Sequence, residues 1–505
     1  MDIKHLSLRQ KLGQLIVTGF PLGSMSFEFV ELVKKYKVGN VILFSYNVES
    51  RAQLTRLCND IQALIKEETG ENAFITIDQE GGAVTRLPKD SFHMPGAMAI
   101  ASTGDSHNAY EAAYRTGVEL RDIGINFNLA PDMDINNNPH NPVIGVRSFG
   151  NTPDIVAEYG LEMIRGYQDA NVMCLAKHFP GHGDTATDSH LSLPCISKTY
   201  EELEKMELIP FKAAIDAQVP AITTAHILYP ELEEDKIPAT MSKRIITDIL
   251  KQRLGFNGLV ISDCLEMSAI KEEYTITNGA IQALKAGVDL IFISHTASAV
   301  KEAIEAMEEA VLDGRLSLGR VEEAVAKVLY YKQKYTSRVM SKQNRSVLEE
   351  NKKYAIKLMK KSITYVNNQK GPLPALGAKP LFMGCKAYRD NNASRNIDNT
   401  LSFSVYMAKA LGGDSAECSI QPDEDEIQKL IGRAMKHSCL IIGTYNGYVN
   451  KGQIALVSRL AKLKMPTIMI ALKVPYDLDE VTDEVYKLAA YEYSQMSFDA
   501  ICSIL

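Results

Sequence analysis

Short apolar runs rich in β-branched residues alternate with longer amphipathic segments over about the first 300 residues of the chain. Eight of these runs have the length of a strand, over 13–19, 39–45, 73–78, 125–130, 172–177, 221–226, 259–263 and 288–294. The segments between them place apolar residues at helical spacing, over 50–66, 107–122, 153–168, 200–217 and 243–254. Ser50 and Thr199 are suited to cap two of these helices. The alternation predicts a parallel sheet, and eight repeats favour a (β/α)8 TIM-type barrel over an open doubly wound sheet.

Polar residues recur where these predicted strands end. The residues in question are Asp78, Asp132, Asp134, Lys177, His178, His226, Asp263 and His295. In a barrel the carboxyl ends of all strands converge on one face, and active sites lie on that face. The phasing of polar residues to strand ends therefore supports the barrel and predicts a site there.

The pattern changes after the eighth predicted strand. Two helices are expected over 319–335 and 346–362, and a Pro- and Gly-containing linker over 364–380. The pattern then restarts, with strands over 380–384, 439–444 and 467–471 and helices over 402–411, 423–436 and 452–463. We therefore expect a barrel over 1–338, a helix and linker over 339–379, and a smaller C-terminal α/β domain over 380–505. We expect no site residues in the C-terminal domain.

Composition excludes several classes of partner. Of the 505 residues, 46% are hydrophobic and 23% charged, which is typical of a globular protein. A net charge of −7 leaves no basic surface for nucleic acid. No apolar stretch is long enough to predict a membrane span or a signal peptide. The 8 Cys are scattered, as expected of free thiols in a reducing compartment. We expect a cytoplasmic monomer or homodimer that binds neither nucleic acid nor membrane.

The most concentrated chemistry lies in the fourteen residues Lys-His-Phe-Pro-Gly-His-Gly-Asp-Thr-Ala-Thr-Asp-Ser-His over 177–190. Its Pro and Gly residues exclude a helix, so it is expected to form a loop after a strand. One interpretation is a metal site built from its histidines and aspartates, although the spacing matches no known metal pattern. The other is a binding and proton-transfer site. Lys177 and His178 would then bind a polar ligand, while Asp188 orients His190 for proton transfer.

Four further residues are candidates for a site. Asp78 begins the segment Asp-Gln-Glu-Gly-Gly, where it could bind a ligand or only cap a turn. Arg86 follows this segment and could donate two hydrogen bonds from its guanidinium group to a polar ligand. Arg147 ends a long Asn-rich loop, where a surface position is the alternative. Asp263 ends the seventh predicted strand and is a candidate nucleophile, whereas Glu266 could simply cap the following turn.

Together these motifs resemble the signature of glycoside hydrolase family 3, in its β-N-acetylglucosaminidase branch. The similarity comprises the segment from Lys177 to Pro194, the Asp78 segment, the Asn-rich loop ending in Arg-Ser-Phe-Gly, and Ser262-Asp263, in the same order. It covers roughly residues 8–335. The resemblance implies a (β/α)8 barrel, no metal or cofactor, and a mechanism that retains anomeric configuration.

The resemblance also implies a role for each candidate. It implies Asp263 as the nucleophile, His190 as the acid/base with Asp188 as its partner, and Asp78, Arg86, Arg147, Lys177 and His178 as contacts to the sugar. The expected substrate is a carbohydrate with terminal β-linked N-acetylglucosamine, from muropeptides of peptidoglycan. Many sugar-binding sites use Trp rings as stacking surfaces. The chain contains no Trp, so we expect the site to bind sugar mainly by polar contacts.

Three other functions remain open from the sequence. A phosphorylase would use the same site with phosphate as acceptor. A β-glucosidase or β-xylosidase of the same family would lack the Asp-x-His pair. A sugar-binding sensor would be expected to lose Asp263 or His190, and both are present. The chain departs from the family at Ala83, where Arg is frequent, and at Cys264, where Asp or Ala is commoner; Ala83 could loosen the contacts to the sugar.

Overall fold

The computed structural model describes residues 3–185, 193–271, 273–336, 345–367, 370–389, 394 and 398–505. Its first sheet has eight strands in the order β4-β3-β2-β1-β8-β7-β6-β5, so the first strand lies beside the last. The strands are β1 (Ile16–Thr18), β2 (Asn40–Leu43), β3 (Phe74–Ile77), β4 (Phe127–Asn128), β5 (Leu175–Phe179), β6 (Ala221–Thr224), β7 (Leu259–Cys264) and β8 (Leu290–Phe292).

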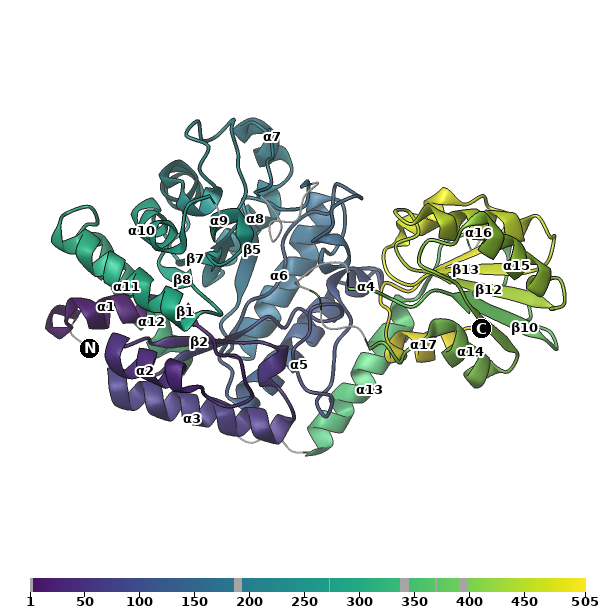
Figure 1. The fold of residues 1–505 in the computed structure, drawn as a ribbon, viewed down its shortest axis with the longest axis horizontal. Coiled ribbons are helices and arrows are strands. Elements are labelled where there is room, and N and C mark those ends of the chain that lie inside the picture. Colours follow the sequence, from purple (N-terminus) through teal and green to yellow (C-terminus); the bar gives the residue numbers. More distant parts are fainter. Residues whose placement is uncertain are drawn as a thin grey trace.

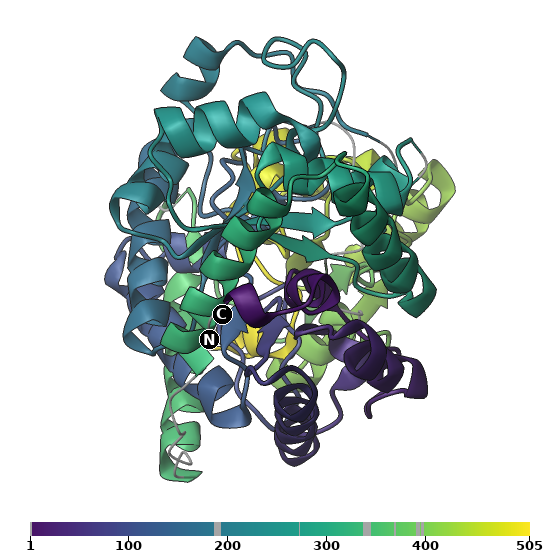
Figure 2. The same cartoon turned by 90° about the vertical axis from the view of Figure 1, so that its left-hand side faces the viewer.

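The sheet closes into a barrel. Every pair of neighbouring strands is parallel. Isolated bridges from Phe127 to Met173 and from Asp132 to Lys177 join the two remaining edges, β4 and β5. Helices surround the strands (Figure 2). The predicted barrel is therefore confirmed, and the open sheet is excluded.

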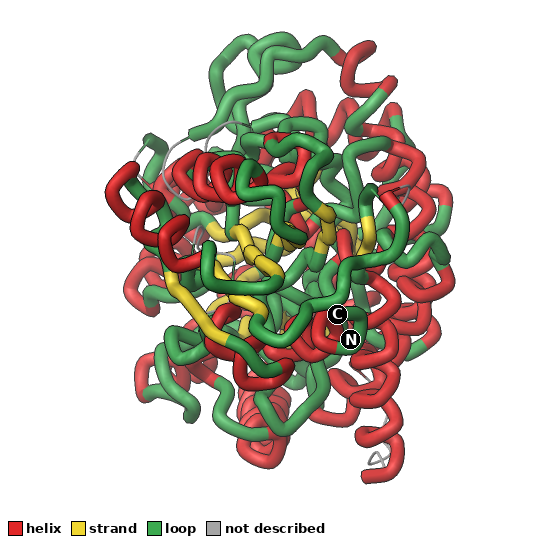
Figure 3. Tube along the Cα trace, turned by 90° about the vertical axis from the view of Figure 1, so that its right-hand side faces the viewer, coloured by secondary structure: helices red, strands yellow, loops and turns green. Residues whose placement is uncertain are grey.

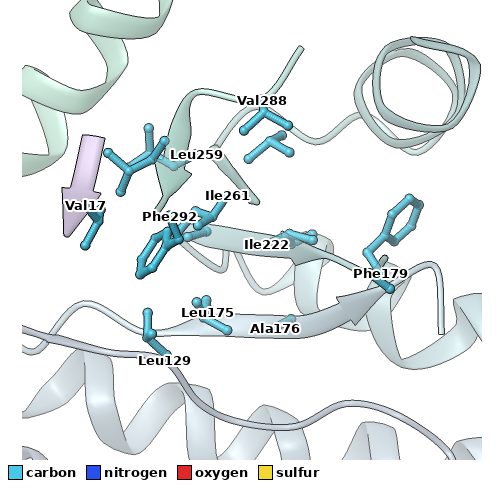
Figure 4. Close-up of a cluster of buried hydrophobic side chains, with 14 of the residues drawn as sticks. Val17, Leu129, Leu175, Ala176, Phe179, Ile222, Leu259, Ile261, Val288 and Phe292 are labelled. Atoms are coloured by element: carbon cyan, nitrogen blue, oxygen red, sulfur yellow. The ribbon is translucent and has the colours of Figure 1, made fainter. Parts of the chain in front are cut away.

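The strands are apolar because both of their faces are covered. Side chains from β1, β5, β6, β7 and β8 meet in the cluster shown in Figure 4, and all of them are buried. Labelled members are Val17, Leu175, Ile222, Ile261 and Phe292. In such a barrel, helices cover the outer face of each strand and other strands cover its inner face. Each strand therefore has a nearly continuous apolar sequence, which is why the sequence pattern located them.

The helices around the barrel follow the predicted order. They are α1 (Leu8–Gln14), α2 (Phe27–Tyr36), α3 (Arg51–Thr69), α4 (Ala97–Ala101), α5 (His107–Ile123), α6 (Pro153–Asp169), α7 (Tyr200–Lys205), α8 (Leu208–Asp216), a π-helical segment (Arg244–Arg253), α9 (Ser268–Lys271), α10 (Ile276–Ala286), α11 (Ala297–Leu312) and α12 (Leu318–Thr336). Two expectations were wrong in detail. The strand expected from residue 13 begins only at Ile16, because a capping box at Ser7 starts α1. The helix expected over 200–217 is broken at Met206, whose backbone leaves the helical region.

The second sheet has six strands in the order β11-β10-β12-β13-β14-β9. They are β9 (Thr364–Tyr365), β10 (Pro380–Gly384), β11 (Asp414–Glu417), β12 (Cys439–Thr444), β13 (Thr467–Ala471) and β14 (Tyr486–Ala489). All pairs are parallel except β14 with β9. The segment expected to be a linker therefore begins with a strand of this sheet.

Helices cover both faces of the second sheet (Figure 3). They are α14 (Phe403–Leu411), α15 (Glu424–Ala434), α16 (Lys451–Ala461) and α17 (Gln495–Cys502). On β12, Leu440 and Ile442 belong to the apolar cluster that includes α15 and α16. Cys439 and Ile441 belong to the cluster that includes α14 and α17. This alternation is the period-two geometry of a strand buried on both sides.

The two sheets belong to neighbouring parts of one molecule (Figure 1). Helix α13 (Arg345–Ser362) contacts α4 of the barrel and α17 of the second part. An apolar cluster of Met98, Val146, Tyr448 and Val474 joins the two parts as well. Among the described residues, no helix is long and apolar enough to cross a membrane.

Candidate active site

A cavity of about 650 Å³ opens at the carboxyl ends of the barrel strands. Six of the eight residues predicted for the site line it: Asp78, Arg86, Arg147, Lys177, His178 and Asp263. They come from the segments after β3 and β4 and from the strands β5 and β7, so the barrel brings together residues far apart in the sequence. The other two, Asp188 and His190, lie outside the described residues.

Glu80 forms the centre of a buried charge cluster in this cavity. Both of its carboxylate oxygens accept hydrogen bonds from Arg147, from Nε at 2.9 Å and from Nη2 at 2.8 Å. Lys177 Nζ lies 2.6 Å from Glu80 Oε1 and 2.9 Å from Asp78 Oδ1. Glu80, Arg147 and Lys177 are all buried. Two cations are thus held in fixed positions by two carboxylates.

The charges in this cluster stabilise one another. Burial by itself would raise the pKa of Glu80, but Arg147 and Lys177 outweigh it, and the pKa lies well below the ordinary value. Burial would likewise lower the pKa of Lys177, yet Asp78 and Glu80 raise it overall. Both groups therefore remain ionised, as paired charges in a water-poor site are expected to be.

Local contacts shape the segment that carries Asp78 and Glu80. Gly81 and Gly82 have φ of +99° and +52°, conformations that residues with a side chain rarely adopt. A Cβ on Gly81 would lie 2.7 Å from the carbonyl oxygen of Pro95. Gln79 Oε1 accepts the backbone N–H of Arg86 at 2.8 Å and ties the segment together. The glycine pair therefore forms a tight turn directly after Glu80.

His178 is held as a neutral imidazole. Its Nδ1 lies 2.7 Å from Asp134 Oδ2, and Asp134 Oδ1 accepts the backbone N–H of His182 at 2.6 Å. Burial, together with the charge of Arg147 and Lys177, lowers the pKa of His178 to about 4. Because Asp134 accepts a hydrogen bond at Nδ1, that nitrogen carries the hydrogen and Nε2 keeps its lone pair.

The loop after His178 is fixed as far as Thr185. Thr185 Oγ1 lies 2.9 Å from His182 Nδ1, and Asn141 Nδ2 donates to the carbonyls of His182 and Gly183. Gly183 is required here, since a Cβ would lie 1.6 Å from the carbonyl oxygen of Ile135. Asp188 and His190 follow this fixed point by three and five residues.

Asp263 is the last residue but one of β7 and is half-buried at the cavity wall. Its Oδ1 accepts the backbone N–H of Cys264 at 2.7 Å. His226 Nε2 donates to the Cys264 carbonyl at 3.0 Å, while its Nδ1 lies 2.8 Å from Thr240 Oγ1. His226 is thus a buried residue that positions the end of β7. Burial raises the pKa of Cys264 to about 12, so the thiol beside Asp263 stays neutral.

The metal interpretation of the central stretch finds little support in the geometry. Asp184 pairs with Lys198 at 2.6 Å. A different trio, Asp132, Asp134 and His178, has potential ligand atoms within 4.8 Å of one another. However, Asp134 and His178 already bind each other, and Arg147 Nη2 lies 3.4 Å from Asp132. A cation would compete with this guanidinium for the same carboxylate.

Sequence reasoning missed several cavity residues. Glu80 lies in a segment that was recognised, but its partners are 67 and 97 residues away. Phe44 and Tyr46 follow β2 and give the cavity an aromatic side, which the absence of Trp did not predict. Arg389 and Ser394 come from the C-terminal region, where we expected no site residues. Only their place in the fold brings them to this cavity.

Comparison with known proteins agrees with this geometry. Residues 7–331 match the model of the glycosyl hydrolase family 3 N terminal domain. The chain is 39% identical to the beta-hexosaminidase A of Pseudoalteromonas piscicida over 280 residues, which are 52% of this chain and 47% of that protein. The chain thus spans about half the length of this relative. It is 34% identical to a beta-hexosaminidase of Nitrosomonas eutropha over 277 residues, 54% of this chain and 78% of that protein.

A solved structure matches almost the whole chain. It is a glycoside hydrolase family 3 beta-N-acetylglucosaminidase from Paenibacillus sp. str. FPU-7, with 36% sequence identity and a TM-score of 0.89. The match covers 99% of this chain and 96% of that one. The matched family model spans more than half of the chain, and it includes every strand of the barrel. The chain belongs to glycosyl hydrolase family 3.

Proposed function

We propose that the chain is a retaining, exo-acting β-N-acetylglucosaminidase that releases terminal β-linked N-acetylglucosamine, with fragments of peptidoglycan as its natural substrates. The observation that carries the proposal is the position of Asp263 in one cavity with the buried cluster of Asp78, Glu80, Arg147 and Lys177. The names of the hexosaminidase relatives and of the Paenibacillus enzyme support the same activity.

The buried cluster suits recognition of a terminal sugar. Sugar hydroxyls need donors and acceptors at fixed positions, and here Glu80 fixes both Arg147 and Lys177. Asp78 adds an acceptor, and the neutral His178 adds a lone pair at Nε2. Groups that are already oriented lose little entropy on binding, so they can favour the distorted ring of the transition state.

The proposed chemistry has two steps. An Asp263 oxygen attacks C1 of the sugar, the bond from C1 to the leaving oxygen breaks, and protonated His190 gives its proton to that oxygen. Water then attacks C1 of the glycosyl-aspartate, His190 takes a proton from the water, and Asp263 leaves as carboxylate. Asp188 is proposed to orient the imidazole. The net reaction adds one water across the glycosidic bond.

The activity is tested with paired aryl glycosides. The purified chain should hydrolyse 4-nitrophenyl N-acetyl-β-glucosaminide far faster than the matching glucoside. Asp263→Asn should reduce this rate by about 10³-fold or more. With Asp263→Ala, azide should restore turnover and give the α-glycosyl azide. Equal rates on both glycosides, or an active Asp263→Asn variant, would overturn the proposal.

The acid/base assignment needs leaving groups of different strength. His190→Ala should slow the release of poor leaving groups, such as a second sugar, much more than the release of 4-nitrophenol. An unchanged rate on disaccharides would contradict the role of His190. Product analysis with and without phosphate separates hydrolysis, which yields free N-acetylglucosamine, from phosphorolysis, which yields the sugar 1-phosphate.

A further inference from the structure

One side of the cavity is aromatic. The ring centroids of Phe44 and Tyr46 are 5.3 Å apart with an interplanar angle of 27°, a stacked arrangement. The ring of His295 lies 4.8 Å from that of Phe44. Phe44 and Tyr46 follow β2, and His295 follows β8, so the three rings come from both ends of the barrel sequence. All three line the same cavity as Asp263.

The aromatic rings and Lys177 come from opposite sides of the barrel in the strand order. The barrel runs β3-β2-β1-β8-β7 on one side and β4, β5 and β6 on the other. Lys177 and His178 belong to β5. Tyr46 follows β2 and His295 follows β8, and these two strands lie on either side of β1. Asp78 after β3 and Asp263 on β7 lie where the two sides meet. The aromatic rings therefore belong to the side of the cavity that lies between Asp78 and Asp263 in the strand order.

The exposure of the residues separates the inner from the outer part of the cavity. Lys177 and Arg147 are 4% and 7% exposed, whereas Tyr46 is 47% exposed. An exo-acting enzyme buries the terminal sugar in the closed end of its pocket and leaves the rest of the substrate at the opening. The rim residues are thus placed to contact the group attached to the terminal sugar.

The rings are held in place and uncharged. Glu266 Oε2 accepts the backbone N–H of His295 at 2.6 Å. Burial lowers the pKa of His295 and raises that of Tyr46 to about 12. A neutral imidazole accepts a hydrogen bond from a protonated phenol, and Tyr46 Oη lies 3.2 Å from His295 Nδ1. The Tyr46 ring is therefore oriented by a partner before any ligand arrives.

We propose that Phe44, Tyr46 and His295 form a platform on which the second sugar ring of the substrate stacks. The inference rests on the proposed function and adds a preference for a substrate whose leaving group is a pyranose with an apolar C–H face. Stacking on a preformed aromatic surface stabilises such a ring without requiring charge. The platform also shows how a chain without Trp can bind sugar through an aromatic surface.

The test compares two substrates that share the terminal sugar. N,N′-diacetylchitobiose carries a second sugar ring, and methyl N-acetyl-β-glucosaminide carries only a methyl group. For Tyr46→Ala we expect the ratio of kcat/KM between disaccharide and methyl glycoside to fall about five- to tenfold. Tyr46→Phe keeps the ring and should keep the wild-type ratio. Tyr330→Ala removes an exposed tyrosine of α12 outside the cavity and serves as the matched control.

The outcomes are distinguishable. A fall in kcat/KM by the same factor on both substrates would place the ring against the terminal sugar and overturn the platform. An unchanged ratio in Tyr46→Ala would also overturn it. If the wild type cleaves neither glycoside, the proposed function fails, and the platform fails with it. If both are cleaved and the ratio falls only for Tyr46→Ala, both proposals stand.

Discussion

Glu80 lies between two cations in the least accessible part of the cavity. It accepts both hydrogen bonds of the Arg147 fork and faces Lys177 at 2.6 Å. The carboxylate therefore holds two residues that the proposed function assigns to sugar binding. Removing its charge would leave two buried cations without their common partner, which costs more than losing a hydrogen bond.

Glu80→Gln is expected to lower the free energy of unfolding by roughly 3–5 kcal/mol, because it removes only one partner of a buried ionic network. It should also lower kcat/KM, since Arg147 and Lys177 lose their fixed positions. Chemical denaturation and steady-state kinetics measure the two effects. Glu68→Gln is the control, because its pair with Lys37 is partly exposed and should contribute about 1 kcal/mol or less. Equal stability losses in the two variants would contradict this account.

Single residues were predictable where they lay in a recognisable segment. Asp78, Lys177, His178 and Asp263 follow predicted strands, and the structure places all four around one cavity. The partnership of Glu80 was not predictable, because no local pattern links it to side chains so distant in sequence. The roles assigned to Asp188 and His190 stay predictions.

At the scale of elements, helix α12 is attached to the barrel by a buried lysine. Lys332 is 1% exposed, and its Nζ donates to Gln14 Oε1 at 2.7 Å and to the carbonyl of Gly39 at 2.9 Å. No carboxylate accepts from Nζ in these bonds. Burial lowers the pKa of Lys332 from the ordinary value of 10.5 to about 7.

This lysine should give the protein a stability that rises with pH. Between about pH 7 and 10.5 the unfolded chain holds a proton on Lys332 that the folded chain lacks, so protonation favours unfolding. The unfolding free energy is therefore highest above pH 10.5, falls steadily as pH falls from 10.5 to about 7, and has no further dependence on Lys332 below that pH. Its slope reaches about 1.4 kcal/mol per pH unit.

Lys332→Met should remove this slope. Urea denaturation at pH 7.5 and about 9 measures the difference in unfolding free energy between wild type and variant. This difference should change by about 1.4 kcal/mol per pH unit. Lys334→Met, two residues along the same helix, is the control because this lysine is exposed, whereas Lys332 is buried. A difference independent of pH would contradict the lowered pKa.

Elements differ in how well the pattern predicts them. The barrel strands and β10, β12 and β13 consist mainly of apolar residues and were found. Ser50 and Thr199 are N-caps as expected. The strands β9, β11 and β14 were missed. Both β9 and β11 are short strands at the sheet edges, and β11 is the polar sequence Asp-Ser-Ala-Glu. Strand β14 lies inside the sheet, but it is short and its sequence Tyr-Lys-Leu-Ala includes a lysine. An edge strand is defined by its neighbour more than by its own residues.

At the scale of the whole molecule, the C-terminal region supports the loops of the cavity. Asn136 Nδ2 donates to Tyr476 Oη at 2.5 Å, and Asn136 Oδ1 accepts the backbone N–H of Gly145, two residues before Arg147. Val474 packs with Val146 in the apolar cluster that joins the two parts. The loop that carries Arg147 is therefore held from the C-terminal side.

Val474→Asp should weaken this attachment and the activity together. A carboxylate in the apolar cluster is expected to cost roughly 2–4 kcal/mol, and kcat/KM should fall about tenfold or more as the Arg147 loop loses its support. Calorimetry and steady-state kinetics measure both. Val449→Asp, at a position 56% exposed, is the matched control and should leave the stability near the wild-type value. Full activity in Val474→Asp would show that the loop needs no support from this side.

The sequence alone determined the strands of the barrel, the loop that follows β5 and the identity of most charged groups in the cavity, because each depends on residues close together in the chain. Apolar runs, glycines with positive φ such as Gly81, and strand-end polar residues act locally. Only the tertiary structure decided that Glu80 pairs with Arg147 and Lys177, that Tyr46 meets His295, and that Arg389 reaches the cavity. Those contacts depend on closure of the barrel and on packing of the second part against it, and neither leaves a periodic trace in the sequence.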